Sequence, residues 1–526
     1  MVKVLISDKM SPRAAQVFRD RGVEVVEQTG MSPEELQAVI SGFDGLAVRS
    51  STKVTEALFA AAHGRLKVVG RAGIGVDNVD LDAATAHGVC VMNTPFGNSI
   101  TTAEHAIALM MALARQLPEA NASTHAGKWE KNRFMGVELY GKTLGVIGCG
   151  NIGSIVCDRA IGLKMRVVGF DPFLSEERAR DMGIERVELD ELLARADFIT
   201  LHTPLTDTTR GIIGRENIAK MKKGVRVINC ARGPLVVEED LREALESGHV
   251  AGAAIDVFAE EPARESALFG LDNVVVTPHL GASTEEAQEN VAIQVAEQMS
   301  DYLLTGAVTN ALNMASVSAE EAPRLRPYFD LARQLGSFAG QLTGSALKAV
   351  SIEYCGAVAE LNTRPLTATV LEWLLRPQMD SINMVNAPLI ARDRDIDVRE
   401  TRVDCPSDYN TLLRVIVTTE RQTRDVVGTL FTDKRPRIVQ VKGIELEAEL
   451  GPNMLYVTNE DKPGFIGTLG STLGDAGVNI ATFHLGRAER GGDAIALIEV
   501  DEPITEDILA RVRALPHVVQ AEALRF

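Results

Sequence analysis

The segment Leu144-Gly-Val-Ile-Gly-Cys-Gly-Asn-Ile-Gly153 decides the fold, because it joins a short apolar strand to a glycine-rich turn. Its glycines Gly148, Gly150 and Gly153 follow the strand, and a predicted helix begins at Asn151. Strand, G-x-G-x-x-G turn and helix in this order are typical of a dinucleotide-binding βαβ unit, in which the helix N-terminus faces a pyrophosphate.

An acidic residue stands where such a unit contacts the ribose. Asp171 ends the next predicted strand, Met165–Phe170, at the spacing of about twenty residues that these units show. A carboxylate there accepts hydrogen bonds from the ribose hydroxyls and repels the 2′-phosphate of NADP, so the sequence predicts NAD. Arg178 and Arg180 lie downstream and keep NADP open as an alternative.

The surrounding sequence predicts two doubly wound sheets. Short Val-rich runs alternate with amphipathic segments over Val2–Ala282, which indicates parallel strands with covering helices. A second strand series begins at Gly141, after the helical stretch Thr101–Arg115, and Ser283-Thr-Glu-Glu286 is the capping start of another long helix. We expect an α/β fold with a split outer domain, residues 1–95 and 284–313, and an inserted Rossmann-like NAD-binding domain, residues 96–283.

The sequence after Asn313 has a different pattern. A helical stretch over Arg326–Gly344 precedes alternating residues at Lys348–Tyr354, and alternation over Leu412–Leu450 predicts antiparallel pairing. The final segment has the βαββαβ order of a ferredoxin-like unit. We therefore expect an α+β intervening domain over residues 314–451 and a small α+β domain over residues 452–526.

Composition narrows the class of protein. The chain has 526 residues, 45% of them apolar, and a net charge of −18, which argues against partners such as nucleic acid or an anionic membrane. The start of the chain, Met1–Asp8, has the pattern of a strand rather than of a signal peptide, and no apolar run has the length of a membrane span. Six scattered cysteines predict reduced thiols and a cytoplasmic location, and no ligand cluster indicates a metal.

Three polar segments follow the ends of predicted strands. They are Asn229-Cys-Ala-Arg-Gly233, Asp256-Val-Phe-Ala-Glu-Glu-Pro262 and Thr277-Pro-His-Leu-Gly281. Ligands bind at this carboxyl edge of open α/β sheets. An arginine there holds a carboxylate, a histidine exchanges a proton with a substrate oxygen, and a glutamate orients the imidazole. The three segments therefore predict hydride transfer involving a 2-oxo acid.

Other residues have competing interpretations. The cluster Gly70–Gly75 is either a tight turn or an anion-binding loop near Arg49 and Arg71. His202 is a weaker acid/base candidate than the histidine of the third segment, and we interpret His105 as a core or interface residue. Cys149 and Cys230 lie beside the expected cofactor, where inert thiols are the simpler reading.

In combination these motifs resemble the D-isomer-specific 2-hydroxyacid dehydrogenases over Val2 to about Asn313. With the two C-terminal units the resemblance extends along nearly the whole chain to the long 3-phosphoglycerate dehydrogenases of that family. It implies the catalytic residues Arg232, Glu261 and His279. It implies NAD contacts at Ile74, Gly148, Gly150, Asn151, Ile152, Gly153, Asp171, Thr203, Cys230, Ala231, Arg232, Asp256, His279, Leu280, Gly281 and Ala282, and substrate contacts at Arg49, Ser50, Gly73 and Asn98.

The C-terminal resemblance is to an intervening domain and an ACT domain, a sensor of small molecules. ACT domains pair edge to edge, which implies an oligomer, and the family suggests a homotetramer. The resemblance implies effector contacts at Asn459, Asp461 and Asn479, and we expect Asp461 and Asn479 to converge at a sheet edge. Arg435, Arg437 and Lys442 are either a solvated hairpin or a distant anion site; Ile444-Glu445 replaces the basic pair of the family pattern.

The resemblance implies a specific reaction, the NAD-dependent oxidation of 3-phospho-D-glycerate to 3-phosphohydroxypyruvate, the first step of L-serine biosynthesis. L-Serine is then the expected effector at the ACT domain, and reduction of 2-oxoglutarate to 2-hydroxyglutarate is a side reaction to consider. The alternatives are a dehydrogenase of another D-2-hydroxyacid, such as glycerate or glyoxylate, and a non-catalytic NAD-sensing protein.

Overall fold

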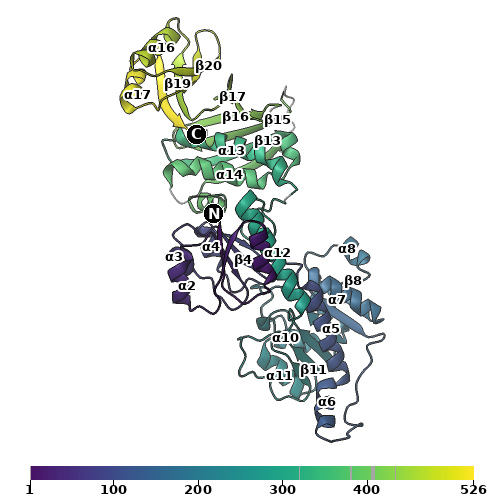
Figure 1. The fold of residues 1–526 in the computed structure, drawn as a ribbon. Helices are drawn as coiled ribbons and strands as arrows, with labels where there is room; N and C mark the ends of the chain where they lie inside the picture. The colour runs from purple at the N-terminus through teal and green to yellow at the C-terminus, as the bar shows by residue number, and fades with distance from the viewer. Residues whose placement is uncertain (1, 319, 380–381, 404–408, 433) are drawn as a thin grey trace.

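The computed structural model describes residues 2–318, 320–379, 382–403, 409–432 and 434–526, which form four separate sheets (Figure 1). The two parallel sheets lie in the N-terminal part of the chain, and the mixed and antiparallel sheets lie in the C-terminal part. The predicted fold class, two Rossmann-like sheets followed by two α+β units, is confirmed.

The first sheet is entirely parallel, in the order β2-β1-β3-β4-β5, and forms the outer domain. Four of its strands are largely buried, as expected where helices cover both faces, whereas the edge strand β2 is partly exposed. The strands are β1 (Lys3–Ile6), β2 (Glu24–Glu27), β3 (Gly45–Val48), β4 (Val68–Arg71) and β5 (Cys90–Met92). The helices are α1 (Arg13–Asp20), α2 (Pro33–Ile40), α3 (Glu56–Ala61) and α4 (Leu81–Ala86).

The second sheet, in the order β12-β11-β10-β9-β6-β7-β8, is also parallel and forms the NAD-binding domain. The strand order reverses beside β6, which is where such sheets bind ligands. The strands are β6 (Thr143–Ile147), β7 (Arg166–Phe170), β8 (Glu185–Arg186), β9 (Phe198–Leu201), β10 (Val225–Asn229), β11 (Val250–Ile255) and β12 (Val274–Val276). The helices are α7 (Asn151–Gly162), α8 (Glu176–Asp181), α9 (Leu189–Arg195), α10 (Arg215–Lys220) and α11 (Glu238–Glu246).

Two long helices join these domains. After β5 the chain enters α5 (Ser99–Arg115), which packs on α7 and β11, and α6 (Leu117–His125) follows. The return helix α12 (Glu285–Thr305) packs on α1 and β4 and thus completes the outer domain (Figure 1). Its cap is Thr284, whose hydroxyl accepts a hydrogen bond from Ala287 N at 3.2 Å. The second domain is therefore inserted into the first.

The third sheet is mixed, in the order β14-β13-β15-β16-β17-β18, and forms the intervening domain. Strand β13 pairs in parallel with β14 and antiparallel with β15. The strands are β13 (Leu347–Gly356), β14 (Asp397–Val403), β15 (Thr411–Thr419), β16 (Thr423–Leu430), β17 (Pro436–Val441) and β18 (Ile444–Ala448). The helices are α13 (Ala322–Gln341), α14 (Arg364–Leu375) and α15 (Ala387–Asp393).

The fourth sheet is antiparallel, in the order β20-β21-β19-β22, and forms the ACT domain. Its elements are β19 (Asn453–Glu460), α16 (Phe465–Asp475), β20 (Ile480–Arg487), β21 (Asp493–Val500), α17 (Glu506–Arg513) and β22 (Val518–Arg525), the expected βαββαβ order. Both faces of this sheet are covered. Leu455 and Val457 of β19 join the core beneath its own helices, whereas Tyr456 packs edge-on against Phe338 of α13 with ring centroids 5.8 Å apart.

Not all of the described cysteines are the reduced thiols that the sequence predicts. Cys90, Cys149, Cys157 and Cys230 are free and buried. Cys355 on β13 is disulfide-bonded, so the prediction of reduced thiols is wrong for this residue. Cys405 lies outside the described residues. Within the described ranges, no helix combines the length and apolar character needed to cross a bilayer.

Candidate active site

The glycine turn after β6 forms an open cradle at the start of α7. Gly148 has φ +92°, and a Cβ there would approach the His202 carbonyl to 2.6 Å, so only glycine fits. A Cβ at Gly150 would meet no atom of the described chain within 4 Å, which leaves space beside the turn. No described side chain caps α7, so its first N–H groups remain available to an anion. These residues fit the pyrophosphate of NAD.

Asp171 lies beside this cradle, just after β7. Its Oδ2 accepts a hydrogen bond from Cys149 N at 2.9 Å, and its Oδ1 accepts one from Phe173 N at 2.8 Å. Each carboxylate oxygen has a second lone pair, so the partly exposed side chain can also accept ribose hydroxyls. Asp171 therefore holds the turn through two backbone N–H groups and still has free lone pairs that can accept hydrogen bonds from the ribose of NAD.

His202 and Thr203 follow β9 on the other side of the turn. The His202 Nε2 lies 2.9 Å from Thr200 Oγ1, and its Nδ1 is buried without a partner among the described residues. Burial lowers the pKa of His202 to about 4, so the ring is neutral near pH 7. This pKa does not suit a general acid/base at neutral pH, in agreement with its lower ranking from the sequence.

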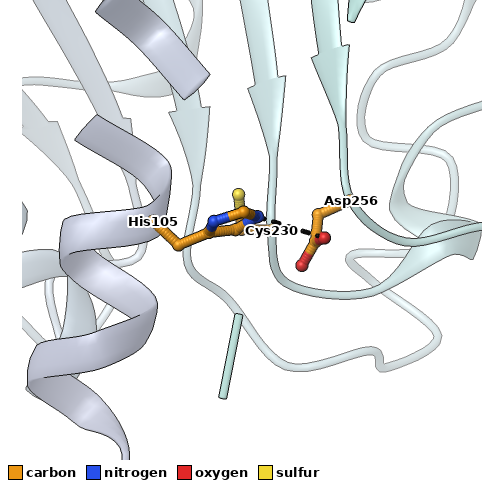
Figure 2. A group of neighbouring side chains, drawn as sticks. All are labelled: His105, Cys230 and Asp256. Atoms are coloured by element: carbon orange, nitrogen blue, oxygen red, sulfur yellow. Dashed lines mark ion pairs between the residues drawn. The ribbon is translucent and has the colours of Figure 1, made fainter. Parts of the chain in front are cut away.

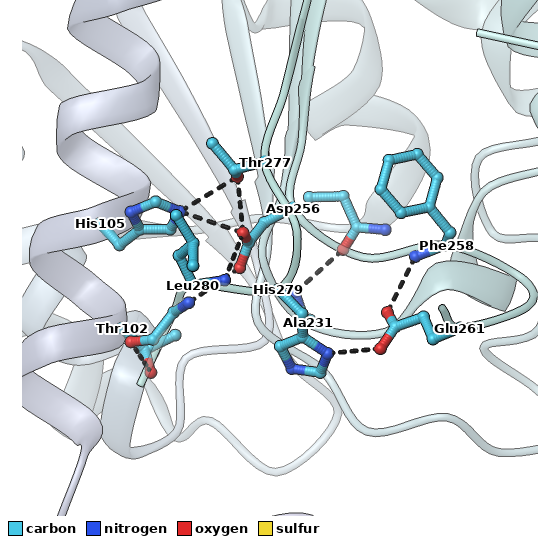
Figure 3. Close-up of polar contacts among 11 residues, drawn as sticks. Thr102, His105, Ala231, Asp256, Phe258, Glu261, Thr277, His279 and Leu280 are labelled. Carbon is cyan, nitrogen blue, oxygen red and sulfur yellow. Dashed lines mark hydrogen bonds and ion pairs between the residues drawn. The ribbon is translucent and has the colours of Figure 1, made fainter. Parts of the chain in front are cut away.

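The predicted acid/base pair is formed at the carboxyl edge of the sheet. His279 Nδ1 lies 2.6 Å from Glu261 Oε2, and Glu261 Oε1 accepts a hydrogen bond from Phe258 N at 3.1 Å (Figure 3). Burial alone would raise the pKa of Glu261, but the bonds from His279 and Phe258 N outweigh it and lower the pKa below its ordinary value. Glu261 is thus ionised and holds His279 with Nδ1 as the donor, which leaves Nε2 for a substrate.

Arg232 extends from the NAD-binding domain to the outer domain. Its Nε donates to Asp77 Oδ2 at 2.8 Å, and its Nη1 donates to the carbonyl of Ala231 at 2.7 Å. A side chain at Gly75 would overlap the Arg232 guanidinium, so the glycine makes room for it. Asp77 was not among the predicted site residues, because only the fold places it beside Arg232.

Two more arginines lie on the outer-domain side of the site. Burial, and then repulsion from Arg232 and Arg49, lowers the pKa of Arg71 to about 10. The Arg71 Nε is buried without a partner in the described part of the chain, as is Asn98 Oδ1. Arg49 Nη1 donates to Gln288 Oε1 at 2.9 Å. We call Arg49, Arg71 and Arg232 the arginine cluster; its positive charge, which Asp77 only partly offsets, suits an anion.

The other predicted cofactor and substrate residues surround the same site. Ile74 is partly buried and its carbonyl accepts a bond from Asn93 Nδ2 at 2.7 Å, while Gly73 N donates to Thr94 Oγ1 at 2.6 Å. Ser50 is exposed next to Arg49. The remaining predicted positions lie in the turns after β10, β11 and β12, namely Cys230, Ala231, Asp256, Leu280, Gly281 and Ala282.

One group beneath the site has the composition of a metal site. His105, Cys230 and Asp256 place their potential ligand atoms within 4.8 Å of one another (Figure 2). Burial, and then the charge of Asp256, raises the pKa of the Cys230 thiol, so it stays protonated and is a poor ligand. The Asp256 carboxylate already accepts several hydrogen bonds. Within the group, His105 and Asp256 contact each other, and both also contact Thr277.

The ACT domain contains a cavity of about 500 Å³ at one end of β19, lined by Asn459 and Asp461 together with Arg487 and the turn at Gly464. Asn479 is not part of it: its Nδ2 donates to Asp501 Oδ2 at 2.6 Å, beyond the far ends of β20 and β21. Within one chain the structure therefore does not bring Asn479 to the other two predicted effector residues.

The basic cluster of the intervening domain is largely paired. Arg437 Nη2 lies 2.9 Å from Glu449 Oε2, and Arg435 Nη1 lies 3.5 Å from Glu449 Oε1. The Arg437 guanidinium also stacks over the Phe431 ring. These contacts favour the hairpin interpretation over an anion site.

Family models match the chain in three successive segments. Residues 107–281 match the D-isomer specific 2-hydroxyacid dehydrogenase NAD binding domain. Residues 324–442 match the D-3-phosphoglycerate dehydrogenase intervening domain, and residues 453–517 match the ACT domain. The order of the matches is the order of the corresponding sheets.

Known proteins agree with these matches. D-3-phosphoglycerate dehydrogenase of Bacillus subtilis (strain 168) is 42% identical over 526 residues, covering 100% of this chain and 99% of the relative. Its counterpart from Methanocaldococcus jannaschii is 42% identical, covering 98% of each. A solved glyoxylate reductase from Paecilomyes thermophila is 30% identical with a TM-score of 0.55, covering 59% of this chain and 98% of that one. The chain belongs to the D-3-phosphoglycerate dehydrogenase family, in the form with intervening and ACT domains, and is an NAD-dependent oxidoreductase.

Proposed function

We propose that the protein oxidises 3-phospho-D-glycerate to 3-phosphohydroxypyruvate, the first step of L-serine biosynthesis. Two observations support the proposal: the His279–Glu261 pair at the carboxyl edge of the second sheet, and the arginine cluster, whose Arg232 follows strand β10 of the same sheet and contacts Asp77 of the outer domain. The substrate has a carboxylate and a phosphate, and a cluster of three guanidinium groups provides charge for both. The relatives named above support the same reaction.

In the proposed mechanism each residue of the site has one task. Arg232 binds the substrate carboxylate, while Arg71 and Arg49 bind the phosphate, which supplies the acceptor that the buried Arg71 Nε lacks. His279 Nε2 takes the proton of the C2 hydroxyl, and Glu261 stabilises the resulting imidazolium through Nδ1–H. Bound NAD supplies the acceptor for the C2 hydride.

The experiment compares NADH formation from 3-phospho-D-glycerate and from D-glycerate. Loss of charge-assisted hydrogen bonds to the phosphate predicts a kcat/KM about 10- to 100-fold lower for D-glycerate. Equal values would favour a dehydrogenase of an unphosphorylated acid, and absence of NADH formation with either acid would favour an NAD sensor. Reduction of 2-oxoglutarate by NADH tests the proposed side reaction in the same assay.

We further propose that L-serine regulates the enzyme through the ACT cavity. Asp461 accepts bonds from Arg487 Nη1 and Gly491 N on Oδ2, so Oδ1 keeps lone pairs for an ammonium group. Asn459 Oδ1 is buried and without a partner among the described residues. The distance of Asn479 from this cavity within one chain favours a site completed by a second chain, in a cytoplasmic homotetramer. The four sheet domains then serve as the predicted substrate, NAD, intervening and regulatory domains.

A further inference from the structure

Helix α5 supports the loop that carries His279 from the side opposite Glu261. Thr102 Oγ1 donates to the carbonyl of Gly281 at 3.0 Å. One turn later, His105 Nε2 lies 3.2 Å from Asp256 Oδ1 and 3.3 Å from Thr277 Oγ1 (Figure 3). The helix therefore contacts the catalytic loop at two successive turns.

The hydrogen-bond pattern fixes which atom of His105 is the donor. Asp256 is fully buried and ionised, because its bonds to His105, Thr277 and Leu280 N lower its pKa despite the opposing effect of burial. An ionised carboxylate only accepts, so Thr277 Oγ1 donates to Asp256 Oδ1 over their 2.6 Å separation. The hydroxyl oxygen and the carboxylate are then both acceptors facing His105 Nε2, so Nε2 carries a hydrogen.

Asp256 in turn determines the path of the catalytic loop. Its Oδ1 accepts from Leu280 N at 2.7 Å, its Oδ2 accepts from Gly281 N at 3.0 Å, and its carbonyl accepts from His279 N at 2.9 Å. The backbone N–H groups of three consecutive residues, 279 to 281, thus all donate to Asp256. His279 itself has φ +57°, a left-handed conformation that persists only where surrounding contacts enforce it.

We propose that His105 is a positioning residue for hydride transfer: its Nε2–H holds Asp256, and Asp256 holds the backbone on which His279 presents its ring. His105 does not touch the substrate. The inference rests on the proposed role of His279 as acid/base. It differs from the initial interpretation of His105 as a core or interface residue, because the side chain has a specific polar task.

The first experiment compares His105→Leu with His105→Gln in the full-length enzyme. The Leu variant removes the donor, whereas the amide of Gln has a comparable reach and restores it. We expect kcat to fall about 10- to 100-fold for Leu, since small displacements of a catalytic group have effects of this size, with KM for the hydroxyacid nearly unchanged. The Gln variant should recover most of the loss. Glu104→Leu, on the exposed face of the same helix, is the matched control and should retain wild-type kcat.

The second experiment combines His105→Leu with His279→Ala, at enzyme concentrations that make residual turnover measurable. If His105 acts through His279, the double variant is no slower than His279→Ala alone. If His105→Leu lowers kcat by the same factor in the His279→Ala variant as in the wild type, the inference is overturned, while the catalytic assignment of His279 stands. Near-normal kcat in His279→Ala would instead overturn the catalytic assignment itself.

Folding is checked separately by the melting temperature and by NADH binding. If the Leu variant does not fold, His105→Asn replaces it, because its shorter amide does not reach Asp256. Wild-type kcat in a folded variant without the donor, or a loss in the Gln variant as large as in the Leu or Asn variant, would contradict a positioning role. A lower melting temperature together with wild-type kcat per folded enzyme would show that His105 has only a structural role.

Discussion

The dehydrogenase site lies at the first two sheets and the ACT cavity at the fourth, and the two differ in how completely one chain forms them. At the dehydrogenase site, one chain pairs His279 with Glu261 and also brings Arg232 of the NAD-binding domain to Asp77 and Arg71 of the outer domain. At the ACT cavity, Asn479 lies at the far end of the strands from Asp461.

This difference indicates a division between the two proposed functions. The predicted catalytic residues need only the folding of one chain, because an inserted domain and its host face each other. In the proposed regulation, the predicted effector residues come together only when two chains associate. Catalysis and regulation should therefore respond differently to the same kind of change, and four measurements test that difference.

The largest effect is expected from His279→Ala. Loss of a general acid/base typically lowers kcat about 10²–10⁴-fold, while NAD binding should survive because the cradle at Gly148–Gly153 is separate. Steady-state kinetics and NADH fluorescence measure the two properties. His87→Ala on the surface of the outer domain is the control. Near-normal kcat would mean that another group handles the proton.

The next effect concerns cofactor choice and Asp171. We expect NAD to be strongly preferred over NADP, and Asp171→Asn to reduce the ratio of the two kcat/KM values by at least about 10-fold. The Asn variant keeps an oxygen for Cys149 N, loses the acceptor for Phe173 N, and lacks the charge that repels a 2′-phosphate. Asp158→Asn on the exposed face of α7 is the control. Equal wild-type values for both cofactors would show that Asp171 does not face the ribose.

A third measurement tests the shared effector site directly. Asp461→Ala and Asn479→Ala should each raise the L-serine concentration for half inhibition by about 10-fold, the loss of one charge-assisted hydrogen bond. Basal kcat should not change. Mixed oligomers of the two variants should regain part of the serine response. At the contact between two different chains, one chain supplies an intact Asp461 and the other an intact Asn479.

No recovery in the mixed oligomers would contradict a site shared between chains. A serine response unaffected by Asn479→Ala would remove that residue from the site. Calorimetry of serine binding to the full-length wild type and to the two variants shows whether a variant no longer binds serine or binds it without inhibition of the enzyme.

The smallest effect is expected on the stability of the intervening domain, at Glu372 of α14. Burial raises its pKa to about 7 against the opposing charge of Arg376 at 2.9 Å. The folded state then binds a proton at Glu372 more tightly than the unfolded state, so the contribution of this group to stability is fully present below the ordinary pKa of 4.5 and is lost as the pH rises through 7, by at most about 3 kcal/mol. Glu372→Gln should flatten the melting temperature between pH 5 and 8, whereas the exposed Glu360→Gln should not.

Much of the architecture could be predicted from local patterns. The glycine turn at Gly148, the strand ending at Asp171 and the βαββαβ order of the ACT domain each depend on neighbours in sequence, and each was predicted. The cap of α12 was predicted within one residue, at Ser283 rather than Thr284. The acid/base pair was predicted because two turns at one sheet edge carry its members.

The remaining features depend on contacts that a local pattern does not encode. Strand β14 is exposed along nearly its whole length and has no apolar alternation to mark it. Asp77 joins Arg232 only because the inserted domain faces its host. His105 lies on a helix with an apolar face, and its polar role follows from the turn of Asp256, which is distant in sequence. The proposed role of Asn479 across chains involves a second molecule, which the pattern of one sequence does not encode.

The insertion of the NAD-binding domain has a mechanical consequence. Two connections, leading into α5 and α12, join the inserted domain to its host and restrict their relative motion more than a single linker would. Because Arg232 donates to Asp77 across the two domains, we expect this contact to break when the domains separate to admit substrate or release product.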